Sequence, residues 1–175
     1  PRGARGAPLT EAELKSSLQS SPYIQAAHPD IVSLARSLTK DKTNALDKAS
    51  AICDWVHDHI EKIASPGVPS AVEVLRTRKG DCNEHTYLFV ALARAAGLPA
   101  NVKIGVVYSA AYGAFCYHAW PAVFADGWIE MDPTFGQKSA DATHIALIEG
   151  EFADQLALAQ VVGRLSIIVL SQETK

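Results

Sequence analysis

Residues 78–99 read RKGDCNEHTYLFVALARAAGLP, and this stretch decides the fold. A turn that contains glycine leads directly into a long apolar helical pattern that begins at Cys82. The pattern stops before Gly97 and Pro99, the residues expected just past the end of a helix. Its apolar residues lie on more than one side, which predicts a central, buried helix over residues 82–96.

Cys82 therefore falls in the first turn of the predicted helix. Unpaired N–H groups and the helix dipole favour an anion there, and such a position lowers the pKa of a thiol. Downstream, two strand-like runs at residues 117–120 and 128–134 contain His118 and Asp132. Cysteine, histidine and aspartate in this order predict a thiol triad that carries out covalent acyl chemistry.

The remaining pattern predicts helices first and hairpin-linked strands later. Helical segments are expected at His28–Leu38, Asn44–Lys62, Ala71–Arg76 and residues 150–160. Strands are expected at Val102–Tyr108, Phe115–Phe124, Trp128–Met131 and Leu165–Leu170, with a hairpin at residues 125–127. This order predicts an α+β domain in which an antiparallel sheet packs on the Cys82 helix.

The length of 175 residues favours a single domain, which we place at residues 10–175 after a flexible tail or linker at 1–9. The chain begins with Pro1, and its single methionine is Met131. We therefore expect a processed form or a fragment of a longer chain, so further domains are possible partners.

Composition excludes several classes of function. The net charge is −3 and no long basic run occurs, which argues against nucleic acid as a partner. No apolar stretch approaches the roughly 18 residues of a membrane span, so no membrane insertion is expected in this segment. Three cysteines, an odd number, argue against a disulfide framework. The sequence has no loop rich in Asp and Asn of the kind that binds calcium. We therefore expect neither a cofactor nor a metal.

About half of the chain, residues 45–137, resembles the transglutaminase-like superfamily of papain-type thiol enzymes. The resemblance rests on short motifs in a specific order and spacing. These motifs are residues 52–60, 71–75, 80–82, 91–100, 118–120 and 132–134. Residues 78–85, 135–137 and 141–144 further resemble a bacterial subgroup that is often attached to other domains in envelope proteins.

The resemblance implies a papain-like core, a peptide or protein substrate and a location in the bacterial cell envelope or periplasm. It assigns the nucleophile to Cys82, the imidazole to His118 and the orienting carboxylate to Asp132. In this chemistry the thiolate attacks an amide carbonyl, and the imidazolium then protonates the leaving amine. The backbone N–H of Cys82 is the expected oxyanion donor, with Asn83 or a tryptophan as the second donor.

An acyl-thioester can pass its acyl group to water or to an amine. Because water is always present and no acidic patch suited to an amine is evident, we favour hydrolysis by a cysteine peptidase or amidase. The alternative to hydrolysis is an acyltransferase reaction, transglutamination, in which a lysine amine accepts the acyl group.

Two interpretations of other classes stay open. Cys82, His85, Cys116 and His118 together offer two thiols and two imidazoles, the ligand count of a structural zinc site. A non-catalytic peptide-binding module on the same fold is the other.

The hairpin sets the position of Asp132 along the sheet. A two-residue turn would pair Trp128 with Ala125 and place Asp132 opposite Pro121, three positions from His118. Because the carboxylate must reach the imidazole ring, we expect a longer loop that places Asp132 directly opposite His118.

Overall fold

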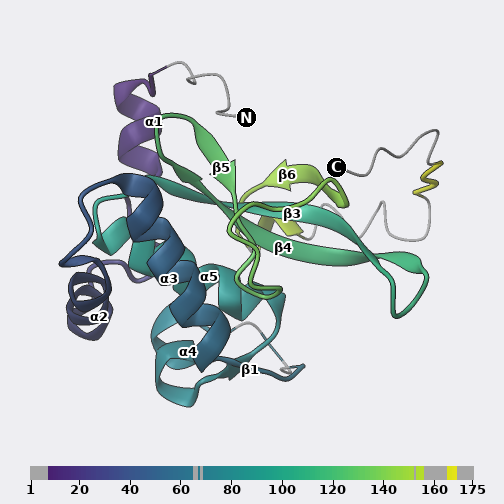
Figure 1. Cartoon of the computed structure of the whole chain (residues 1–175), viewed down its shortest axis with the longest axis horizontal. Coiled ribbons are helices and arrows are strands. Elements are labelled where there is room, and N and C mark those ends of the chain that lie inside the picture. The colour runs from purple at the N-terminus through teal and green to yellow at the C-terminus, as the bar shows by residue number, and fades with distance from the viewer. Residues whose placement is uncertain (1–7, 65–66, 68, 152, 156–164, 169–175) are drawn as a thin grey trace.

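The computed structural model describes residues 8–64, 67, 69–151, 153–155 and 165–168. Figure 1 shows the helices gathered on one side of a twisted sheet. The helices are α1 (Glu11–Ser16), α2 (Pro29–Thr39), α3 (Ala45–His59), α4 (Ala71–Thr77) and α5 (Cys82–Ala95). The strands are β1 (Glu61–Lys62), β2 (Lys79–Gly80), β3 (Ala100–Ser109), β4 (Ala114–Phe124), β5 (Trp128–Glu130) and β6 (His144–Glu149). None of the described helices is long and apolar enough to cross a membrane.

The main sheet has four antiparallel strands in the order β5-β4-β3-β6. Strands β3 and β4 form a long hairpin, from the pair Ala100–Val123 to the pair Ser109–Ala114. Strands β1 and β2 form a separate parallel pair close to the start of α5. The predicted α+β class, with helices first and an antiparallel sheet after them, is confirmed.

Helix α5 is the centre of the fold. It contacts α2, α3 and α4 as well as β3 and β4. Asp81 precedes it as the N-cap and forms a capping box with Glu84, which explains why the helix begins at Cys82. Leu88 and Leu92 are fully buried, and burial of each such side chain contributes about 1.5–3 kcal/mol. The predicted central helix is therefore present and ends one residue earlier than expected.

Two helical predictions need correction. Helix α1 was not predicted, although Thr10 and Glu13 form the capping box that signals its start. The helix expected to reach Lys62 ends at His59, because residues 61 and 62 leave it to pair with β2. Tertiary pairing thus overrides the helical pattern at this end.

The strand predictions fail beyond Pro133. Strand β6, at His144–Glu149, was not predicted. Residues 165–168 of the expected late strand are not in a strand, and residues 169–170 lie outside the described part. Of the expected helix at 150–160, residues 153–155 are helical, whereas residues 152 and 156–160 lie outside the described part of the chain. Residues 1–7 of the expected tail lie outside it as well.

The hairpin between β4 and β5 has a three-residue loop. Phe124 pairs with Trp128, and the N–H of Ala125 donates to the carbonyl of Gly127 at 2.8 Å. Asp126 has a φ of 60°, a left-handed value that Asp tolerates better than most residues.

This loop sets a strand register that lies between the two considered from the sequence, which placed Asp132 opposite Pro121 or opposite His118. The N–H of Met131 donates to the carbonyl of Pro121 at 2.9 Å, which places Asp132 across from Trp120. The expectation that Asp132 lies directly opposite His118 is therefore wrong. Asp132 lies two positions away from that place along the strand. A diagonal neighbour on the same face still lies within reach of a long side chain.

Gly105 provides a test of the β3–β6 pairing. A Cβ at this position would lie 2.0 Å from the backbone oxygen of Ile145, which cannot move without shifting β6. We predict that Gly105→Ala lowers the free energy of unfolding by about 1–3 kcal/mol, as overpacking does. Urea denaturation measures the change, with Val106→Ala as the control on the same strand. An unchanged midpoint for Gly105→Ala would contradict the close approach of β6.

Candidate active site

The imidazole of His118 and the carboxylate of Asp132 form a buried pair. His118 lies on β4 and Asp132 follows the end of β5. His118 Nε2 is 2.7 Å from Asp132 Oδ2. The exposed fraction is 4% for His118 and 0% for Asp132, so water does not separate or screen the two groups. The structure thus brings together the predicted histidine and aspartate.

Asp132 has further partners on both oxygens. Oδ1 accepts the backbone N–H groups of Thr134 at 2.8 Å and Phe135 at 3.1 Å. Oδ2 also lies 3.0 Å from Nε2 of a second histidine, His144. Burial alone would raise the pKa of Asp132, but the hydrogen bonds from His118 and His144 outweigh burial and lower it. Asp132 is therefore an ionised carboxylate with every acceptor position in use.

Cys82 lies close to strand β4, which contains His118. The backbone amides of Ala119 and Asn83 lie close enough to its sulfur to lower its pKa, and Ala119 is the residue that follows His118. The hydroxyl of Thr86, one turn along α5, donates to the carbonyl of Ala119 at 3.0 Å. Cys82, at the start of α5, therefore lies near the part of β4 that contains His118, and Asp132 reaches His118 from the turn after β5.

The thiol itself is in an environment that disfavours its charge. Burial raises the pKa of Cys82 to about 12, and the neighbouring carboxylate of Asp81 contributes in the same direction. The backbone N–H of Asn83 at the helix N-terminus does lower this pKa, as expected, but burial outweighs it and the net shift is upward. A thiolate at neutral pH therefore requires a positive partner.

One expected oxyanion donor, the Cys82 N–H, is engaged in another hydrogen bond, whereas the side-chain amide of Asn83 is held through its oxygen. The N–H of Cys82 donates to Asp81 Oδ1 at 2.5 Å. Asn83 Oδ1 accepts from the hydroxyl of Tyr117 at 3.3 Å and from Gln155 Nε2 at 2.9 Å. A substrate carbonyl that uses the Cys82 N–H must displace the carboxylate of Asp81.

The zinc interpretation does not match the geometry. In the described part of the chain, the one group of three or more candidate ligands is His118, Asp132 and His144, whose ligand atoms lie within 4.8 Å of one another. The four residues proposed from the sequence do not meet, and His85 Nδ1 is instead 2.7 Å from the carbonyl of Asp81. In the group that does meet, both imidazoles lie within hydrogen-bonding distance of Oδ2 of Asp132, so these residues form a hydrogen-bonded cluster.

Three neighbouring residues of the site were not assigned a role from the sequence. His144 belongs to a quoted motif, residues 141–144, but its contact with Asp132 depends on β6. Thr86 has no sequence signal of its own. Trp120 is fully buried and donates from Nε1 to Glu130 Oε2 at 2.7 Å.

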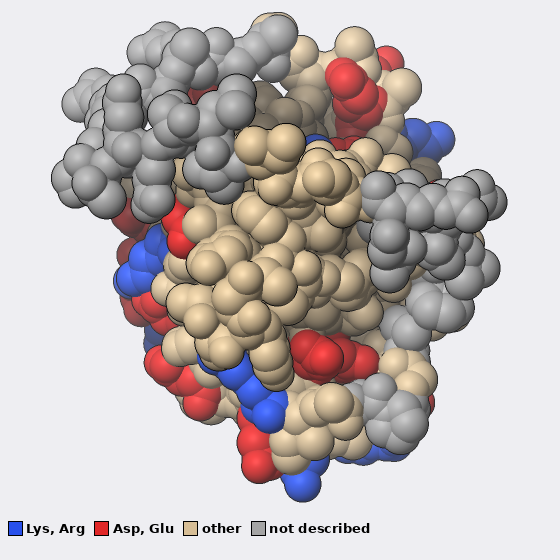
Figure 2. All heavy atoms as spheres, turned by 90° about the vertical axis from the view of Figure 1, so that its right-hand side faces the viewer, with Lys and Arg blue, Asp and Glu red and all other residues tan. Residues whose placement is uncertain are grey.

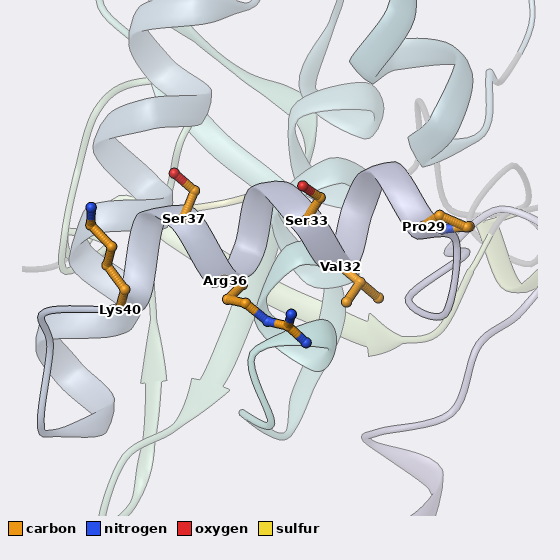
Figure 3. A pocket seen from close by; sticks show the side chains of 6 residues that line it. All are labelled: Pro29, Val32, Ser33, Arg36, Ser37 and Lys40. Carbon is orange, nitrogen blue, oxygen red and sulfur yellow. The ribbon is translucent and has the colours of Figure 1, made fainter.

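A pocket elsewhere lies along α2 and contains no residue of the site. Its lining residues all belong to this helix or follow it directly (Figure 3). They are Pro29, Val32, Ser33, Arg36, Ser37 and Lys40. This lining lacks a nucleophile with a base beside it, so the pocket does not compete with the Cys82 site as a catalytic centre.

The fold and the site define an α+β protein with a thiol on the central helix and a histidine–aspartate pair on the adjoining sheet. A family model described as the transglutaminase-like superfamily matches residues 32–133. The chain belongs to the transglutaminase-like superfamily.

Similar proteins agree with this assignment. Kyphoscoliosis peptidase of Mus musculus is 29% identical over 125 residues, which are 63% of this chain and 19% of that protein. A candidate cysteine protease from Cytophaga hutchinsonii superimposes with a TM-score of 0.73 and 25% identity, over 83% of this chain and 50% of that chain. The periplasmic domain of TgpA from Pseudomonas aeruginosa, at 21% identity and a TM-score of 0.58 over 73% of this chain and 49% of that chain, shares the fold.

This chain spans about half of the C. hutchinsonii protein and about a fifth of the mouse protein. The matches come from a mouse and from bacteria, so they support the superfamily and not the bacterial subgroup in particular.

Thr86 tests how Cys82 is held against β4. Thr86→Val keeps the shape but leaves the buried carbonyl of Ala119 without its donor, which costs about 1–3 kcal/mol of stability. We also predict a drop of about 10-fold or more in the rate of Cys82 alkylation, because the thiol shifts from its position. Thr86→Ser keeps the hydroxyl and serves as the control. Equal alkylation rates in the valine variant and the parent would contradict this role.

Proposed function

We propose that this chain carries out thiol-dependent acyl chemistry on peptide or protein amides through Cys82, His118 and Asp132. The observation that carries the proposal is the 2.7 Å contact of His118 Nε2 with the buried carboxylate of Asp132, on a strand whose next residue, Ala119, has its backbone amide near the sulfur of Cys82. Membership of the superfamily supports thiol chemistry on peptides in general.

Each residue has a separate role in the proposed reaction. Cys82 transfers its proton to His118 and attacks the amide carbonyl carbon. The C–N bond breaks, and His118 returns the proton to the leaving amine. Asp132 orients the imidazole and stabilises its positive charge. The acyl-thioester that remains on Cys82 then reacts with water or with an amine.

We favour water as the acceptor, and therefore cysteine peptidase or amidase activity. Figure 2 shows the face of the molecule at the tip of the β3–β4 hairpin. This face is mainly uncharged at its centre, and most charged side chains lie at its margins. Exposed tyrosines of this hairpin, Tyr108, Tyr112 and Tyr117, suit a peptide chain better than a cationic amine. Transglutamination is the alternative and differs only in the acceptor.

We also propose a peptide or protein partner and a location in the bacterial cell envelope. The TgpA domain that shares this fold is periplasmic, and that location is a property of TgpA. Detection of the native protein in a periplasmic extract, and its absence from the cytoplasmic fraction, tests this part of the proposal.

Selective alkylation tests the thiol. With iodoacetamide near pH 6, we predict that peptide mapping finds Cys82 labelled before Cys116 and before the fully buried Cys53. His118→Ala should abolish this preference, because the thiol then has no positive partner. Cys116→Ser should leave the rate at Cys82 unchanged. Labelling of Cys53 or Cys116 first would remove Cys82 as the nucleophile.

Substitutions test the reaction. With dimethylated casein and a fluorescent primary amine, intact mass spectrometry follows the acyl adduct on Cys82, new peptide ends and amine incorporation. We predict that Cys82→Ala and His118→Ala abolish turnover, a loss on the order of 10⁶-fold, and that Asp132→Asn retains partial activity.

Cys53→Ala is the matched control for the thiol and should keep full activity. Near-normal turnover in His118→Ala would contradict the proposed triad. Amine incorporation in place of new peptide ends would favour transglutamination over hydrolysis.

A further inference from the structure

A second imidazole binds the carboxylate of the proposed triad. His144 is the first residue of β6, and its side chain is 1% exposed. Its Nε2 lies 3.0 Å from Asp132 Oδ2, the oxygen that His118 Nε2 approaches at 2.7 Å. Two imidazoles therefore share one carboxylate oxygen, whereas the proposed reaction uses only His118.

The other side of the His144 ring faces a second carboxylate. Nδ1 lies 3.2 Å from Asp141 Oδ1 and 3.3 Å from the carbonyl oxygen of Asp141. Asp141 Oδ1 is itself fixed by the backbone N–H of Thr143 at 2.9 Å. Both ring nitrogens of His144 thus face groups that can only accept hydrogen bonds. A neutral imidazole has one N–H, so only the imidazolium can donate to both sides.

The remaining surroundings of His144 are aromatic. Its ring lies edge-on to Trp120, with centroids 5.1 Å apart, and 5.7 Å from the ring of His118. Burial alone would lower the pKa of His144, but the hydrogen bonds and charges of Asp132 and Asp141 outweigh burial and raise it.

We propose that His144, held as an imidazolium between Asp132 and Asp141, is a positioning residue that fixes Asp132 and sets the pH range in which Cys82 and His118 are both charged. This inference rests on the proposed function for its effect on turnover.

The effect has a definite sign. A positive charge on His144 takes up part of the charge of Asp132 and lies close to His118, so it disfavours an imidazolium at His118. It also favours a thiolate at Cys82, although from farther away. Removing that charge should therefore move both limbs of the pH profile to higher pH, and the alkaline limb should move more, by about one pH unit.

The variants separate charge from structure. His144→Gln keeps a donor toward Asp132 but cannot carry the charge. Asp141→Asn leaves His144 in place but removes one of its two carboxylate partners, so it should shift the limbs in the same direction and by less. His57→Gln is the control, because His57 Nδ1 contacts the same loop through the carbonyl of Pro133 at 3.1 Å and does not reach Asp132.

The primary measurement does not require an active enzyme. In the Cys82→Ala background, histidine NMR titrations should show His144 with a proton on both ring nitrogens at pH 7. The midpoint of the His118 titration should rise by about one pH unit in His144→Gln and should stay unchanged in His57→Gln. The pH profile of kcat/KM in the active background should shift in parallel.

A His144 ring with one proton at pH 7, or an unmoved His118 midpoint in folded His144→Gln and Asp141→Asn, would overturn the inference. If His144→Gln does not fold, the Asp141→Asn comparison alone decides. The expected NMR shifts in a protein without turnover would support the charge arrangement and count against the proposed function, so the two failures are distinguishable.

Discussion

The site depends on keeping one buried carboxylate ionised. An unpaired charge without access to water costs several kcal/mol, so a carboxylate with 0% exposure must find its compensation within the protein. Asp132 finds it in two backbone N–H groups of the following turn and in the imidazoles of His118 and His144. Its own N–H and carbonyl pair with Gln137. One side chain thus connects the turn after β5 to strand β4 and strand β6.

The thiol reaches this cluster from the helical side. Helix α5 brings Cys82 to the backbone of Ala119, and the hydroxyl of Thr86 fixes the same residue through its carbonyl. Because Ala119 directly follows His118, the contacts that hold the helix against β4 also influence the position of the sulfur relative to the imidazole. The packing of α5 on β4 and the position of the Cys82 thiol therefore depend on the same contacts.

Local signals predicted the helices, and long-range contacts decided the rest. Asn44 and Asp81 cap their helices through neighbouring groups, so a sequence window contains the needed information. Strand β6 has a weaker strand pattern than Leu165–Leu170. It forms because β3 pairs with it and because its first residue, His144, contacts Asp132. Strand propensity depends on such a context.

The same division applies to the site. The three proposed catalytic residues could be identified because they belong to motifs with a fixed order. The contact between His144 and Asp132 depends on β6 and could not be identified. The diagonal placement of Asp132 depends on the conformation of the three-residue hairpin loop, which allowed more than one register in the sequence.

The two ends of the proposed triad have opposite electrostatic surroundings. At the carboxylate end, hydrogen bonds lower the pKa of Asp132 and favour its ionised form. At the thiol end, burial and Asp81 raise the pKa of Cys82, so the helix terminus alone does not produce a thiolate. In the proposed reaction, the proton of Cys82 therefore moves to an imidazole that the carboxylate of Asp132 already stabilises. Because Asp81 also accepts the N–H of Cys82, a substrate oxygen that takes this N–H would displace a carboxylate that opposes the thiolate.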